Sequence, residues 1–220
     1  EVWARLPNTF KLAATSTIIA IVLALPLGVI AAIKQNTLFD GVSMFISLLG
    51  ISIPIFWFGL LLILLFSVTL GWFPVSGADQ GLKSLVLPSL ALGFQHMAAI
   101  ARTTRSSMLE QIRQDYIRTV RAKGLPEGEV ITKHALRNAL IPTTTVIGLQ
   151  MGGMLGGSVL TESVFAWPGI GRYMVQSIQG RDIPSVMGCI IIFAISFALI
   201  NLLVDLIYGF IDPRIKAQYK

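Results

Sequence analysis

Charged residues divide this chain into long apolar stretches. Five ranges carry no charged side chain: 12–33, 41–78, 84–101, 138–161 and 183–204. An α-helix rises about 1.5 Å per residue, so about 20 residues cross a hydrocarbon core of about 30 Å, and each range can hold one membrane span. The buried helices of a large soluble protein would normally keep a polar stripe on their outward face. The pattern therefore predicts an all-α polytopic membrane protein with five spans in this chain.

The longest hydrophilic stretch, residues 102–141, separates the third span from the fourth. It holds eight basic residues against four acidic ones: Arg102, Arg105, Arg113, Arg118, Arg121, Lys123, Lys133 and Arg137 against Glu110, Asp115, Glu127 and Glu129. By the positive-inside rule this loop is cytoplasmic. Alternation then places segment 34–41 on the same side, and segments 72–84 and 162–182 outside.

The C-terminal tail supports the same orientation. Its basic residues, Arg214, Lys216 and Lys220, favour the cytoplasm. With five spans and a cytoplasmic C-terminus, Glu1 falls outside. We therefore expect a sixth span to precede Glu1.

Composition supports the interpretation as a membrane protein and argues against a metal site or a disulfide. Hydrophobic residues make up 54% of the chain and charged residues 13%, whereas an average soluble domain carries about 25% charged residues. The single cysteine, Cys189, lies in the last apolar range, where a small buried side chain is expected. His96 and His134 are too far apart in sequence to predict a metal site, so we expect none; helix neighbours are expected to satisfy His96.

The cytoplasmic loop contains residues that typically end one helix and begin the next. Gly124 can end one helix in a left-handed conformation, and Pro126 can occupy the first turn of the next. Glu127 and Glu129 suit the positive end of that second helix. The loop is thus predicted to form two short helices joined at a tight bend. Pro142 and the threonines 143–145 predict another break, with possible caps, before the fourth span.

Two further features concern the spans themselves. Pro54 interrupts the second span and predicts a kink, which suits either packing or gating. In the fourth span Gly148, Gly152 and Gly156 recur every four residues, the spacing at which membrane helices approach closely. These glycines serve helix packing or line the substrate passage; the sequence leaves both open.

Catalytic patterns are absent from the sequence. It has no G-x-x-x-x-G-K-[ST] phosphate-binding loop and no paired-carboxylate, Ser-His-Asp or metal-ligand arrangement. We therefore expect no enzyme activity and no cofactor in this chain. Active transport would need a partner ATPase or an ion gradient. Asp205 is the candidate for ion coupling, although a membrane-border anchor paired with a nearby base is the other interpretation.

The basic loop also raises the question of nucleic acid or lipid binding. Its interleaved acids and helix punctuation favour a shaped protein-docking surface instead. No nucleic-acid partner is expected.

The segment DYIRTVRAKGLPEGEVITKHALRNALIP, residues 115–142, resembles the inner-membrane permeases of the dipeptide, oligopeptide and nickel ABC importer family. RLPNTFKLA at 5–13, TESVFAWPGIG at 161–171 and DLIYGFIDPRI at 205–215 resemble the first core helix, the external loop and the C-terminal end of that family. The resemblance covers nearly the whole chain.

Importer permeases in general carry the pattern EAA-x3-G-x9-I-x-L-P in the loop that docks the ATPase. Gly124 matches its glycine and Leu136 its leucine. Arg118, Thr119 and Val120 stand at the E-A-A positions, and His134 and Arg137 replace the isoleucine and proline. These departures look like the peptide and nickel permease variant.

The resemblance implies a type I ABC importer transmembrane domain over residues 9–210, with the ATPase-docking loop at 102–141 and a cytoplasmic tail at 211–220. It implies coupling to the ATPase through the tip of the loop, which consists of Ala122, Lys123, Gly124 and Leu125. Closure of the ATPases would push on this tip and open the passage outward, and ATP hydrolysis would return it inward.

The expected partners are a second related permease, two cytoplasmic ATP-binding subunits that hold ATP and Mg, an external substrate-binding protein and the lipid bilayer. The expected location is the bacterial inner membrane. Peptides are the first substrate class, followed by nickel chelates and glutathione-like compounds. The alternative function is an ion-coupled secondary transporter or a membrane scaffold.

Overall fold

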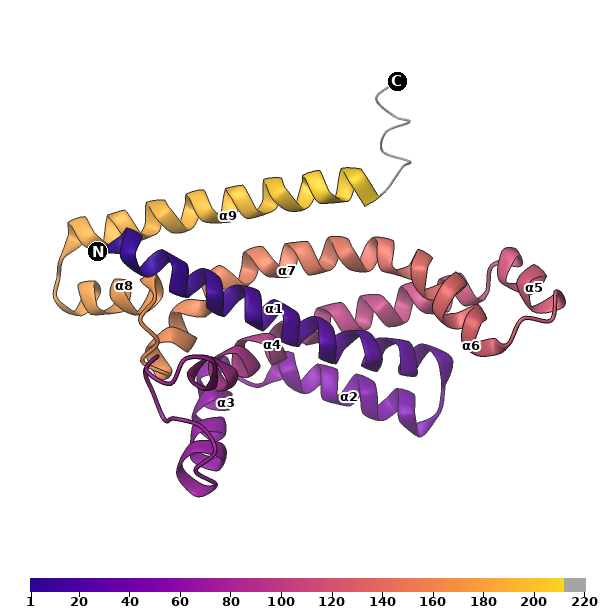
Figure 1. Cartoon of the computed structure of the whole chain (residues 1–220), viewed down its shortest axis with the longest axis horizontal. Helices are drawn as coiled ribbons and strands as arrows, with labels where there is room; N and C mark the ends of the chain where they lie inside the picture. Colours follow the sequence, from indigo (N-terminus) through magenta and orange to yellow (C-terminus); the bar gives the residue numbers. More distant parts are fainter. Residues whose placement is uncertain (212–220) are drawn as a thin grey trace.

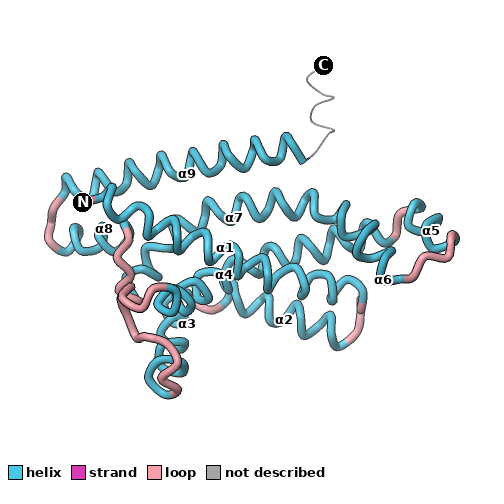
Figure 2. The backbone as a smooth tube through the Cα atoms, viewed as in Figure 1, coloured by secondary structure: helices cyan, strands magenta, loops and turns pink. Residues whose placement is uncertain are grey.

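The computed structural model describes residues 1–211, which form helices joined by turns and by a longer loop at 70–81, without a β-strand in that range (Figures 1 and 2). The elements are α1 (Val2–Ile33), α2 (Leu38–Ser52), α3 (Ile55–Leu62), the π-helical segment η1 (Ile63–Thr69), α4 (Leu82–Ile112), α5 (Asp115–Ala122), α6 (Glu127–Glu129), the π-helical segment η2 (Val130–Ala135), α7 (Leu136–Val164), α8 (Ile170–Gln179) and α9 (Ile183–Ile211). The predicted all-α class is confirmed.

Helices α1 and α4 form the centre of the bundle, and they make the most extensive contact in the chain. They run parallel, because Gly28 lies against Ala101 and Thr104, while Gly93 lies against the carbonyl oxygen of Ser16. A Cβ atom at position 93 would stand 2.7 Å from that oxygen, so glycine allows the two backbones to approach. The sequence pattern of spaced glycines in the fourth span did not reveal this central contact.

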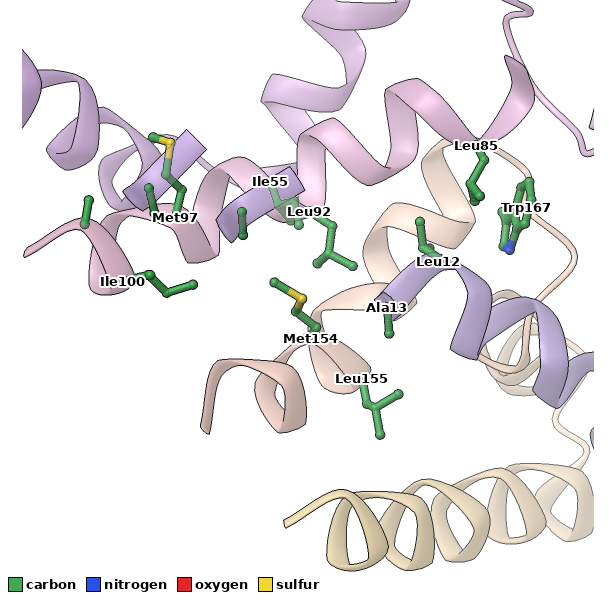
Figure 3. Packing of buried hydrophobic residues seen from close by; sticks show 13 residues of the cluster. Leu12, Ala13, Ile55, Leu85, Leu92, Met97, Ile100, Met154, Leu155 and Trp167 are labelled. Atoms are coloured by element: carbon green, nitrogen blue, oxygen red, sulfur yellow. The ribbon is translucent and has the colours of Figure 1, made fainter. Parts of the chain in front are cut away.

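The main core lies between α1, α4 and α7 (Figure 3). Leu92 of α4 and Met154 of α7 are fully buried and point toward one another in the close-up, and Ile55 at the start of α3 lies beside Leu92. Trp167, which follows α7, closes the outer end of this core near Leu85. The middle of the bundle is therefore packed from four separate parts of the chain.

The predicted kink at Pro54 is a complete break. Helix α2 ends at Ser52, Ile53 and Pro54 are extended, and α3 continues at an angle of 106° to α2. Proline lacks a backbone N–H and disfavours helical geometry in the residue before it, which explains the break at this pair. The second predicted span is thus a bent pair of helices.

The predicted break before the fourth span is wrong. Pro142 lies inside α7, and α6, η2 and α7 follow one another without a turn from Glu127 to Val164. The threonines do not cap a helix: Thr143 and Thr144 donate their hydroxyls to the carbonyl oxygens of Ala139 and Leu140, four residues earlier in the same helix. The second of the two short helices in the loop is therefore the beginning of a long one.

Loops predicted on one side of the membrane gather at one end of the bundle. At the outer end, the backbone N–H of Gly77 donates to the carbonyl oxygen of Phe165. At the other end, Arg113 donates to the side chain of Gln35. This grouping agrees with the predicted topology.

By length and composition, three of the described helices can cross a membrane, namely α1, α4 and residues 183–204 of α9, and the bent pair α2–α3 makes up to four. The prediction of five included α7, whose sequence is richer in glycine and threonine and which is not among these helices. In Figure 1, α7 nevertheless runs alongside α1 and α4. The predicted tail at 211–220 lies, apart from Ile211, outside the described residues.

Candidate functional site

The bend at the tip of the cytoplasmic loop has the conformation that its sequence predicts. Gly124 has φ +79°, and its N–H donates to the carbonyl oxygen of Arg121 at the end of α5. A Cβ atom at position 124 would meet nothing within 4 Å, so backbone conformation, and not space, requires glycine here. Pro126 precedes α6 as its N-cap in an extended conformation, one position earlier than predicted.

The four predicted coupling residues lie together on this tip. Ala122, Lys123 and Gly124 are exposed, and Leu125 is half-buried. Leu125 packs on a buried cluster that also contains Ile117 of α5 and Val130 of η2. The tip thus presents an exposed surface on a packed base.

An ion pair bridges the bend. Arg121 donates from Nε and Nη2 to the two carboxylate oxygens of Glu127, at 3.1 and 2.6 Å. The adjacent guanidinium holds the pKa of Glu127 below its usual value. One turn further, Lys133 donates to Glu129 at 2.9 Å and lowers the pKa of that carboxyl in the same way. Both acidic residues lie in the first turn after the bend, where the positive end of the helix favours them, as predicted.

The base of the loop joins the bend to the membrane helices. Its buried cluster contains Ala32 of α1, Met108 of α4 and Ala139 of α7, in addition to Ile117 and Val130. The base of the loop therefore packs on side chains of all three of these helices.

The residues at the positions of the general importer motif are distributed around this base. Val120 and Leu136 pack on the cluster, whereas Arg118, Thr119 and Arg137 are exposed. His134 is half-buried, and its carbonyl oxygen accepts a hydrogen bond from the amide of Asn138.

The three glycines of the fourth span have two different surroundings. A Cβ atom at Gly148 would overlap Val204 of α9, and one at Gly152 would stand 2.9 Å from the ring of Phe197. Gly156 meets nothing within 4 Å and lines an apolar cavity of about 460 Å³ between α7, α8 and α9. Gly148 and Gly152 therefore serve packing of α7 on α9 within this chain.

The remaining singled-out residues do not form a site together. Cys189 is buried in α9, and His96 of α4 is half-buried against Gly153 and Gly157 of α7. Within the described residues, no group of three or more His, Cys, Asp or Glu side chains could hold a metal ion. The side chain of Asp205 lies outside the described residues.

Sequence reasoning missed a buried carboxylate at the outer end of the bundle. Glu162, near the end of α7, is fully buried, and its Oε1 accepts the hydroxyl of Thr9 at 2.7 Å. Its Oε2 accepts the backbone N–H of Arg172 at 3.0 Å. Thr9 in turn accepts the backbone N–H of Ile170 at 2.9 Å. The first turn of α8 is thus held by side chains of α7 and α1.

Further hydrogen bonds surround this arrangement, which we call the outer clamp: Thr9, Glu162 and the first turn of α8. The indole of Trp167 donates to the carbonyl oxygen of Asn8, whose amide donates to the carbonyl oxygen of Pro168. The guanidinium of Arg172 donates to the carbonyl oxygen of Ala166. The signal in the sequence was an acidic residue, Glu162, next to a long uncharged range and followed by a Pro-Gly turn.

Comparison with known proteins decides the family. The family model of the binding-protein-dependent transport system inner membrane component matches residues 24–217. The chain belongs to this family. The predicted membrane protein class is therefore confirmed, and the chain is a permease subunit of an ABC importer complex.

Curated relatives agree with this assignment. The chain is 48% identical to the dipeptide transport system permease protein DppB of Alkalihalophilus pseudofirmus, over 98% of this chain and 73% of that protein. It is 43% identical to the oligopeptide transport system permease protein AppB of Bacillus subtilis, over 98% and 71%. It is 46% identical to the glutathione transport system permease protein GsiC of Escherichia coli, over 98% and 70%.

Solved structures confirm the fold of a type I importer permease. A chain of the MetNI methionine ABC transporter superposes with a TM-score of 0.79 at 22% identity, over 93% of each chain. A chain of an amino acid ABC transporter superposes with a TM-score of 0.73 at 16% identity, over 94% of this chain and 92% of the other.

Proposed function

We propose that this chain forms half of the passage of an ATP-driven importer of peptides or glutathione-like compounds in the bacterial inner membrane. The observation that carries the substrate class is the high identity to dipeptide, oligopeptide and glutathione permeases over 98% of the chain. The other half of the passage comes from a second, related permease. An external binding protein delivers the substrate.

The energy comes from two partner subunits in the cytoplasm that bind ATP and Mg, since this chain contains no phosphate-binding loop. The tip formed by Ala122, Lys123, Gly124 and Leu125 is their contact. Its exposure and its packed base support this role, because a push on the tip passes directly to α1, α4 and α7.

The substitution Gly124→Asp tests the coupling. It adds a charge to a surface that should fit a cleft in the ATPase, where an unpaired buried charge is costly, and it strains a residue at φ +79°. In proteoliposomes that contain the whole complex and its binding protein, we expect uptake and substrate-stimulated ATP hydrolysis to be lost while the complex stays assembled.

Two matched variants separate charge from strain. Gly124→Asn places a neutral side chain of the same shape at this position, and asparagine and aspartate tolerate a left-handed backbone about equally, so the two variants differ mainly in charge. Gly128→Asp places the same charge on α6, where a Cβ atom meets nothing within 4 Å. Normal transport by Gly124→Asp would contradict the assignment, and loss of the assembled complex would indicate a purely structural glycine.

Competition measures the substrate class. Uptake of a labelled dipeptide should be inhibited by unlabelled dipeptides and glutathione, should require ATP and should survive a proton uncoupler. Uptake that persists without the ATPases but fails with the uncoupler would favour an ion-coupled transporter instead.

A further inference from the structure

Helix α4 is the central helix of the bundle, yet one strip of it is left open. Gln95, Ala99, Arg102 and Ser106 recur at spacings of four, three and four residues, so they share one face of the helix. Gln95 and Ala99 are half-buried, and Arg102 and Ser106 are exposed. The other faces of α4 are covered by α1, α2, α3 and α7. We call these four residues the α4 strip.

The outer part of the strip, Gln95 and Ala99, lies at membrane depth. The uncharged part of α4 extends from residue 84 to residue 101, and Gln95 is 12 residues beyond Lys83, which we place outside. At about 1.5 Å per residue this distance is about 18 Å, slightly past the middle of a core of about 30 Å. Arg102 lies about 10 Å further toward the cytoplasm.

Several exposed side chains of α9 and α1 at this depth are apolar. Ile191, Ile195 and Leu199 of α9 are each more than half exposed, as is Val22 of α1. Such side chains suit contact with lipid. An amide at this depth is costly against lipid, so Gln95 is expected to face water or another protein, whereas Arg102 lies at the cytoplasmic border of the core, where loop 102–141 begins. The α4 strip therefore belongs to a different environment from the apolar faces.

Contacts of neighbouring residues of α4 show where the α4 strip ends on its outer and cytoplasmic sides. Phe94, the residue before Gln95, stacks on Phe58 of α3 with ring centroids 4.7 Å apart. Gly59 of α3 lies against Phe165 at the outer end of α7. Helix α3 thus bridges α4 and α7 on the outer side of Gln95. On the cytoplasmic side, Met108 of α4 packs on the base of the coupling loop.

We propose that Gln95, Ala99 and Arg102 line the substrate passage across the inner half of the membrane. The Gln95 amide offers hydrogen bonds to the backbone of a crossing peptide, and the Arg102 guanidinium attracts its carboxylate. This proposal rests on the proposed function for its substrate class. It also gives the coupling loop a direct effect on the passage, because both act through α4.

Water access is the first test. In the assembled complex with Cys189→Ala, we expect Gln95→Cys and Ala99→Cys to react with a small hydrophilic thiol reagent in at least one nucleotide state. The control is Ile195→Cys on α9, which is 51% exposed and apolar in its surroundings. A dipeptide with its binding protein and ATP should slow labelling of positions 95 and 99 and leave that of position 195 unchanged. Equal labelling of positions 95 and 195, or none at 95 and 99 in any state, would overturn the proposal.

Substrate charge is the second test. Loss of one charge-assisted hydrogen bond is worth about 1.5 kcal/mol, so Arg102→Gln should lower uptake of a free-carboxylate dipeptide roughly tenfold relative to its C-terminally amidated analogue. Arg102→Lys should restore most of the ratio. The ratio of the two uptake rates is measured for the variant and for the wild-type complex with the same binding protein. The selectivity of the binding protein is then the same in both measurements and cancels.

An unchanged ratio would overturn the contact between Arg102 and the substrate. A wild-type complex that takes up neither dipeptide would instead contradict the proposed function. The labelling comparison between positions 95, 99 and 195 would still decide whether the strip faces water.

Discussion

The two ends of this bundle are built in opposite ways. At the outer end, the carboxylate of Glu162 is fully buried and accepts hydrogen bonds from Thr9 and Arg172 of this chain. At the cytoplasmic end, the tip from Ala122 to Gly124 is exposed, and the Arg121–Glu127 pair that spans it is open to solvent. The outer end is thus internally satisfied, whereas the inner tip keeps its surface available for a partner.

The contrast predicts where a substitution affects folding and where it affects coupling. Buried polar groups are costly to leave without partners, so changes at the outer clamp should reduce stability. Exposed loop residues contribute little to stability, so changes at the tip should act through the partner. The expected effects on stability therefore decrease from the buried clamp to the exposed bend.

The largest effect is expected for Glu162→Ala. It removes the acceptor of the Thr9 hydroxyl, which is buried, and of the Arg172 N–H, which is half-buried. We expect a loss on the order of 3 kcal/mol in free energy of unfolding, measured by thermal unfolding of the detergent-solubilised complex. Glu162→Gln is the conservative control: it keeps one acceptor oxygen, so it should lose about half as much. Equal stability of all three proteins would show that the clamp does not stabilise the outer end.

The second-largest effect is expected where α7 packs on α9. Gly148→Val places side-chain atoms where Val204 lies, and overpacking typically costs about 1–3 kcal/mol. Gly156→Val adds the same side chain in the same helix, where a Cβ atom meets nothing within 4 Å. We expect reduced thermal stability of the first variant and near wild-type stability of the second. The opposite order would contradict the assignment of Gly148 to packing.

The residues discussed so far also show which features of the fold could be predicted from the sequence. The left-handed Gly124 and the position of the interruption at Pro54 follow from local backbone chemistry, so the sequence predicted both, although it predicted a kink at Pro54 and not a complete break. The roles of Gly148 and Gly156 depend on which helix lies opposite, and their common spacing did not distinguish them. The pairing of Glu162 with Thr9 spans 153 residues and could not be predicted from either segment alone.

The predicted break at Pro142 failed for a related reason. A proline in a soluble helix usually ends it, but in a membrane bundle neighbouring groups compensate for the lost hydrogen bond. The threonines after it looked like caps, but the hydroxyls of Thr143 and Thr144 are instead satisfied inside α7.

A smaller effect is expected for Gly124→Ala. Alanine at φ +79° costs about 1 kcal/mol, and no neighbour adds to this strain. We expect a slight loss of thermal stability and a partial loss of coupling, measured as uptake per ATP hydrolysed. Gly128→Ala, within α6, should leave coupling intact. Full coupling in both variants would indicate that the conformation of the bend is not transmitted.

The smallest effect concerns pH at the bend. Arg121 lowers the pKa of Glu127 in the folded loop, so the pair contributes stability that is fully present above the unfolded pKa, near 4.5, and is lost as pH falls through the lower folded value. The pair is exposed, so its contribution should stay below about 1 kcal/mol and should weaken in high salt. Amide hydrogen exchange of residues 115–129 at pH 7 and at pH 4 measures this contribution.

The control variant is Arg121→Gln. It should abolish the protection against exchange that the ion pair adds at pH 7, together with the decline of that protection toward pH 4, while exchange around Glu162 stays unchanged. A decline of the same size in Arg121→Gln would assign the pH dependence to another group, because that variant no longer has the guanidinium that lowers the pKa.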